Sequence, residues 1–204
     1  MKKRIFFFAI AIASILTVYA FRKSFINNAI LTIAPSISSH SIGEKLDSFQ
    51  GVYVYYNGDI DHVLERNVAK DGYNIGLKYQ CVEFVKRYYY LHYKHKMPNS
   101  YGHAKDFYDK KLTDNSINKD RNLYQFSNPS NTKPRVGDIL MFDGHLGNPY
   151  GHVAIVSQVL DNQIEIIQQN PGPGAPSREF LDMENNNGKY SLAAGLGWIG
   201  KRTP

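Results

Sequence analysis

Residues 76–91 read GLKYQCVEFVKRYYYL and carry the clearest structural signal in the chain. Glu83 and Arg87 form an i,i+4 pair in the stabilising orientation. The pattern predicts a helix that begins close to Cys81. Six side chains recur at three- and four-residue spacing and so fall on one face of this helix; they are Cys81, Phe84, Val85, Tyr88, Leu91 and His92.

The rest of the chain indicates one more short helix and several strands. The helix is expected over about 104–111, and the polar, Asn- and Pro-rich stretch 114–133 indicates a surface loop. Because helices come first and an antiparallel meander follows, the predicted fold class is α+β. The strands are predicted from β-branched and aromatic runs bounded by turn residues; they are 52–56, before the first helix, and 139–142, 151–159, 163–170 and 196–199.

Length, cysteine count and charge exclude several classes of protein. The chain has 204 residues, enough for one domain with its own core. Its single cysteine excludes an intrachain disulfide framework and Cys-rich zinc sites. The net charge of +6 indicates little about partners, because five of the positive charges lie at the N-terminus, on Lys2, Lys3, Arg4, Arg22 and Lys23. The remaining sequence is close to neutral, so no nucleic-acid partner is expected.

Residues 5–21 form an uncharged apolar run between these basic residues. Such a segment is typical of an export signal or an N-terminal membrane anchor, and it is at the short end of what spans a bilayer. Residues 1–23 are therefore expected to be a cleaved signal peptide or, narrowly favoured, an uncleaved anchor. In either case, 24–43 is expected to be a linker and 44–204 a domain outside the cytoplasm, whether membrane-anchored, periplasmic or secreted.

A lone cysteine at a helix N-terminus is a candidate nucleophile, because the helix dipole favours the thiolate. A cysteine nucleophile also needs a histidine within hydrogen-bond reach and a third group that orients this histidine. His152 opens the predicted strand 151–159. In a hairpin with 163–170, the start of the first strand pairs with the end of the second. This pairing places His152 beside Gln168 or Asn170.

The other histidines are weaker candidates. His145, in the loop before that strand, is the alternative base. His92 and His95 lie too far along the first helix to reach its start. The sequence has no His-Glu-x-x-His motif or carboxylate cluster that would indicate a metal site, and no cofactor is expected.

Blocks of sequence in this order resemble the CHAP domain family of cysteine- and histidine-dependent amidohydrolases and peptidases. Within that family, the chain most resembles the amidase half of bifunctional glutathionylspermidine synthetase/amidase, over roughly residues 45–200. The resemblance implies a papain-like fold with N-terminal helices packed on an antiparallel sheet. The blocks are 79–87 (YQCVEFVKR), 134–140 (PRVGDIL), 151–156 (GHVAIV) and 167–170 (IQQN).

The resemblance also implies roles for individual residues. Cys81 would be the nucleophile, and His152 the general base and later the general acid. The backbone N–H of Cys81, with the Gln80 side chain as a second donor, would form the oxyanion hole. The family usually has an acidic residue where this chain has Gln168, and Asn170 is the alternative orienter of the imidazole. A glutamine can orient the ring but cannot stabilise an imidazolium by charge.

The expected function is therefore an exported thiol amidohydrolase or peptidase that works through an acyl-enzyme. Cell-wall peptide is the substrate that the export segment favours, and glutathionylspermidine or a related amide is the one that the sequence likeness favours. The alternative of another class is a catalytically silent binding module of the cell envelope, which Gln168 would support. Membrane contact is expected only through residues 5–21, if they are not removed.

Overall fold

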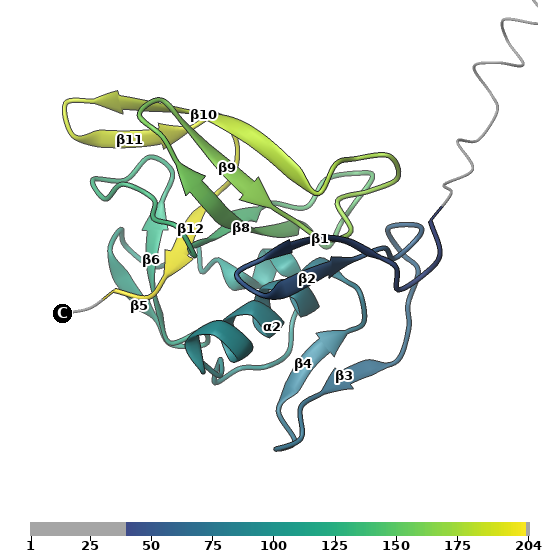
Figure 1. Cartoon of the computed structure of the whole chain (residues 1–204). Coiled ribbons are helices and arrows are strands. Elements are labelled where there is room, and N and C mark those ends of the chain that lie inside the picture. Colours follow the sequence, from purple (N-terminus) through teal and green to yellow (C-terminus); the bar gives the residue numbers. More distant parts are fainter. Residues whose placement is uncertain (1–39, 203–204) are drawn as a thin grey trace, which may run out of the picture. The chain divides into compact units, whose positions relative to one another are not determined.

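An antiparallel sheet of eight strands is the largest element of the fold (Figure 1). The computed structural model describes residues 40–202. The strands are β5 (Ser116–Asn118), β6 (Leu123–Ser127), β7 (Ile139–Phe142), β8 (His152–Val159), β9 (Gln163–Ile167), β10 (Arg178–Asn186), β11 (Lys189–Leu192) and β12 (Gly197–Gly200). Their order across the sheet is β11-β10-β9-β8-β7-β12-β6-β5. The predicted meander is therefore present from β7 to β11, and β12 returns to pair between β7 and β6.

One helix and two hairpins complete the architecture of the described residues. The helix is α2 (Cys81–Tyr93), and it contacts β8 of the large sheet. The hairpins are β1 (Lys45–Phe49) with β2 (Val52–Tyr55), and β3 (Arg66–Val68) with β4 (Asn74–Leu77). Strands β2 and β4 also contact α2. Gly76 permits the close approach of β4, because a Cβ there would lie 3.0 Å from Cα of Glu83.

The core has two parts because both faces of β7 and β8 are buried. Ile139, Met141, Val153 and Ile155 belong to the cluster that includes the helix side chains Phe84, Val85, Tyr88 and Tyr89. The residues between them point to the opposite face, as alternation in a strand requires. They pack in a second cluster around Trp198, together with side chains of β6, β9, β10 and β11; its members from β7 and β8 are Leu140, Ala154 and Val156.

Several expectations about secondary structure were wrong. The described residues contain one α-helix rather than several N-terminal helices. The helix expected over 104–111 is only a 3-10 turn, η1 (Ala104–Phe107), because Tyr108, the residue that follows it, has extended backbone geometry. The stretch 114–133 is not all loop. It contributes β5 and β6, and Phe126 of β6 is fully buried against Trp198.

The predicted N-terminal signal or anchor, 1–23, lies outside the described residues, as does most of the predicted linker. Within residues 40–202, no helix is long and apolar enough to cross a membrane. Export of the protein therefore stays a prediction from the sequence.

Candidate active site

Cys81 is the first residue of α2, as the sequence predicts. The preceding Gln80 has extended backbone geometry and makes no side-chain cap, so the N–H groups of the first turn are not capped by a side chain. The N–H groups of Cys81 and Val82, together with that of Val153 from β8, lie against the Cys81 thiol. Donors grouped in this way at a helix N-terminus can stabilise a developing oxyanion.

His152 lies at the start of β8, next to Val153, and therefore on the strand that approaches Cys81. The preceding Gly151 has a φ of +76°, and a Cβ there would lie 2.6 Å from the carbonyl oxygen of Phe142. This tight turn is open only to glycine, and it sets the direction in which β8 begins. His152 is thus the immediate neighbour of Val153, whose N–H lies against the Cys81 thiol.

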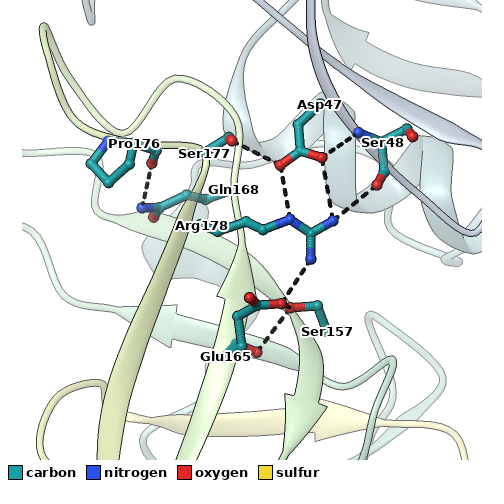
Figure 2. Close-up of polar contacts among 8 residues, drawn as sticks. All are labelled: Asp47, Ser48, Ser157, Glu165, Gln168, Pro176, Ser177 and Arg178. Carbon is teal, nitrogen blue, oxygen red and sulfur yellow. Dashed lines mark hydrogen bonds and ion pairs between the residues drawn. The ribbon is translucent and has the colours of Figure 1, made fainter.

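Gln168 is the residue that contacts the imidazole. Its Oε1 lies 3.0 Å from Nε2 of His152. Its Nε2 donates to the carbonyl oxygen of Pro176 at 3.2 Å, as Figure 2 shows, which fixes the orientation of the amide. Because Oε1 can only accept, Nε2 of the imidazole carries the proton. Nδ1 of His152 then has a lone pair available to take a proton from a thiol.

Burial favours the neutral forms of both candidate catalytic groups. Burial raises the pKa of the Cys81 thiol to about 11, although the N–H groups of Val153, Val82 and Cys81 act in the opposite direction. Burial lowers the pKa of His152 to about 4, which the hydrogen bond to Gln168 opposes only in part. The expectation that the helix N-terminus lowers the thiol pKa is therefore wrong here, because desolvation outweighs the helix dipole.

The other proposed site residues have different positions. Asn170 does not contact His152. Strand β9 ends at Ile167, and Asn170 has a φ of 54°, so the alternation of the strand does not continue to it. Its Nδ2 donates to Oε1 of Gln80 at 3.0 Å. The alternative base His145 is exposed in its loop.

Gln80 was expected to supply a second oxyanion donor, but its side-chain N–H groups donate to other acceptors. Its Nε2 donates to the carbonyl oxygens of His62, at 2.8 Å, and Ile60, at 3.4 Å. Asn170 also donates to Ile60, at 3.0 Å. The two amides therefore fix the loop around residues 60–62, and the backbone N–H groups of α2 are left as the candidate oxyanion donors.

Cys81 opens into a cavity of about 420 Å³. Its walls come from the loop around residue 61, the β3–β4 hairpin, the segment 100–104 and the loop before β8. Gln80 and Asn170 also line it. Among the residues that the structure describes, no three His, Cys, Asp or Glu side chains come together in a way that could hold a metal ion.

Comparisons with known proteins place these residues within a family domain. A family model described as the CHAP domain matches residues 70–170, a span that includes Cys81, His152 and Gln168. The chain belongs to the CHAP domain family. A bifunctional glutathionylspermidine synthetase/amidase of Escherichia coli (strain K12) is 32% identical over 152 residues, which are 68% of this chain and 24% of that protein. A glutathionylspermidine synthase of Crithidia fasciculata is 28% identical over 142 residues, 64% of this chain and 20% of that protein.

The chain thus spans about a quarter or less of the length of these relatives. What it shares with the family is the CHAP domain, and this domain implies amidohydrolase or peptidase activity. The match begins at residue 70, so the β1–β2 hairpin and all of β3 lie before the part of the chain that the family model covers.

Within the CHAP domain, a buried network supports the start of α2, and sequence reasoning missed it. Gln169 donates from Nε2 to the carbonyl oxygen of Gln80 and to Oε2 of Glu83, both at 3.0 Å. Glu83 pairs with Nε of Arg87 at 2.6 Å and accepts from Asn67 at 2.7 Å. The i,i+4 spacing of Glu83 and Arg87 indicated the pair, but not that it is buried or that Gln169 joins it.

Proposed function

We propose that this protein is a cysteine-dependent amidohydrolase in which Cys81, His152 and Gln168 act together. The observation that carries the proposal is the hydrogen bond from His152 Nε2 to Gln168, on the strand whose next residue, Val153, has its N–H close enough to the Cys81 thiol to lower its pKa. This arrangement leaves Nδ1 of the imidazole as the base. A papain-like arrangement of helix and sheet is part of the same proposal.

The reaction follows from the neutral resting state. Sγ of Cys81 attacks the amide carbonyl carbon as its proton passes to Nδ1 of His152. The N–H groups at the start of α2 stabilise the resulting oxyanion. The C–N bond then breaks, His152 protonates the departing amine, and a thioester remains on Cys81. Water, deprotonated by His152, attacks the thioester and releases the acid and the free thiol.

Two substrate classes are candidates. The relatives include proteins named as glutathionylspermidine synthetase/amidase, and this supports an amide of the glutathionylspermidine type. A cell-wall peptide is the second candidate, and it depends on export through residues 5–21, with the domain 44–204 outside the cytoplasm. In either case the ligand is a peptide or a small amide.

The experiment measures hydrolysis of both candidate substrates by the full chain. The wild type should release amine from at least one of them, and denaturing mass spectrometry should detect a thioester on Cys81. Cys81→Ala should abolish release, and His152→Ala should lower kcat/KM by about 10²- to 10⁴-fold. His145→Ala, in an exposed loop, is the matched control and should be fully active. Binding of either substrate without turnover would instead support a silent binding module.

A further inference from the structure

Arg66 lies on the wall of the cavity that contains Cys81. It is the first residue of β3 and pairs with Leu77 of β4, four residues before the proposed nucleophile. The close packing of Gly76 against Glu83 holds this hairpin on α2. The backbone of Arg66 is therefore tied to the helix that carries Cys81, and its exposed side chain extends from this fixed point.

The guanidinium group has unused hydrogen-bonding capacity. Nη1 donates to Oδ1 of Asn74 at 3.1 Å, and the group lies 5.4 Å from the ring centroid of Tyr101, which also lines the cavity. An arginine has five N–H donors, and its planar fork matches a carboxylate. No carboxylate of residues 40–202 forms an ion pair with Arg66. Arg87 and Arg178, by contrast, each have such a partner.

Two buried basic side chains donate to the backbone of residues 99–100, beside the segment that lines the cavity. Lys86 donates from Nζ to the carbonyl oxygen of Ser100 at 2.6 Å, and Arg121 donates from Nη1 to that of Asn99 at 2.5 Å. Neither has an ion-pair partner among the described residues. Burial, and then the nearby charges of Arg121 and Arg66, lowers the pKa of Lys86 to about 7. Lys86 is thus close enough to both arginines to be repelled by each of them.

An anion in the cavity would relieve this repulsion. Asp61 is the one carboxylate among the described residues that line the cavity, and it is exposed. We propose that Arg66 binds a free carboxylate of the substrate, so that the cavity selects amides of acidic peptides. The inference rests on the proposed function, because it places the carboxylate within the cavity that holds Cys81. Both a glutathionyl group and a cell-wall stem peptide can supply such a carboxylate.

The experiment uses pairs of substrates. The two members of a pair are identical except at one group, which is a free carboxylate in one member and the carboxamide in the other. One pair is a glutathionyl amide with the glutamyl carboxylate free or amidated, and the other is a stem peptide treated in the same way. The wild type should favour the free carboxylate by about 10- to 100-fold in kcat/KM, mainly through KM. Arg66→Gln should remove this preference, with a much larger loss of kcat/KM on the carboxylate member than on the carboxamide member, whereas Arg66→Lys should restore part of it.

Two matched controls isolate the role of Arg66. Arg135→Gln makes the same change at an exposed arginine outside the cavity and should keep the preference. Asp61→Asn changes a charged group inside the cavity and should also keep it. An equal loss on both members of a pair in Arg66→Gln, or a wild type without preference, would overturn the inference.

The pair that shows the carboxylate effect identifies which source the cavity accepts. Failure of the proposed function would look different, because no substrate would be turned over. In that case, calorimetric titration of the same pairs into Cys81→Ala still tests Arg66. Tighter binding of the carboxylate member, lost with Arg66→Gln, would support the inference, and equal binding of both members would overturn it.

Discussion

Gln168 and Gln169 follow one another at the end of β9, but they support opposite halves of the site. The side-chain amide of Gln168 contacts the imidazole of His152 through Oε1, at 3.0 Å, and the carbonyl oxygen of Pro176 through Nε2, at 3.2 Å. Gln169 points to the other face, where it binds the Gln80 carbonyl and Glu83. Gln168 positions the proposed base, and Gln169 positions the turn that carries the proposed nucleophile.

The two halves differ in charge. The Gln169 half contains a buried ion pair, because Glu83 and Arg87 are 1% and 8% exposed. The Gln168 half is neutral at the imidazole, and its nearest ion pair, Asp47 with Arg178, is partly exposed and reaches Gln168 only through Ser177 and Pro176 (Figure 2). Stability should therefore depend mainly on the Gln169 half, and proton transfer mainly on the Gln168 half.

The largest expected effect is on stability. Glu83→Gln leaves Arg87 buried without a carboxylate, and this should lower the free energy of unfolding by about 3–5 kcal/mol. Urea denaturation followed by the fluorescence of Trp198, the single tryptophan, measures it. The control is Glu65→Gln, which breaks an exposed pair with Lys78 and should leave stability almost unchanged. Equal losses in the two variants would mean that burial of the pair does not matter.

The next effect is a dependence of stability on pH. The pKa of His152 is about 4 in the folded protein and 6.5 without burial, so the unfolded chain binds more protons between these values. Stability should fall as the pH drops from about 6.5 to 4, by at most about 3 kcal/mol from this group. His152→Leu should remove that part of the slope, as urea midpoints across this pH range would show. The exposed control, His145→Leu, should retain the wild-type slope; loss of slope in both variants would contradict the assignment.

Part of the fold and part of the candidate site could be predicted from the sequence. Strands β7 and β8 are predictable because their apolar, β-branched runs are local, and hairpin geometry predicts His152 beside Gln168 or Asn170, of which the structure shows Gln168. The role of Gln169 depends on the packing of α2 near the end of β9, where Gln169 binds Gln80 and Glu83. These residues are far from Gln169 in the sequence, so a local pattern does not indicate the contact. Strand β6 was missed because its burial comes from pairing with β12. The raised thiol pKa was missed because a sequence pattern indicates the helix dipole but not the extent of desolvation.

A third prediction concerns the introduction of a negative charge beside the imidazole of His152. In Gln168→Glu, a carboxylate beside the imidazole should raise the pKa of His152 and favour the thiolate–imidazolium pair. The rate of alkylation of Cys81 by iodoacetamide should therefore reach its midpoint about 1–2 pH units lower than in the wild type. In the wild type, the rate should still be rising well above pH 9, because the thiol pKa is about 11. Gln169→Glu is the matched control on the other face, and an equal shift there would show that the effect is not specific to the imidazole.

The smallest expected effect tests whether the β1–β2 hairpin acts on the base through Gln168. Nε of Arg178 pairs with Asp47 at 2.9 Å, and Oγ of Ser177 donates to the same carboxylate at 2.8 Å, which restrains the segment whose Pro176 carbonyl holds Gln168. Arg178→Met should lower the free energy of unfolding by less than about 1 kcal/mol, because the pair is partly exposed.

The same variant should lower kcat about two- to fivefold with KM unchanged, as a barrier change of about 0.5–1 kcal/mol gives. Arg178→Lys should recover part of the loss, and Lys110→Met, which breaks an exposed pair with Asp143, should change neither constant. A double-mutant cycle with Gln168→Ala is decisive. If Arg178 acts through Gln168, its loss has no further effect on kcat once that amide is gone; additive losses would show that the hairpin acts on the site by another route.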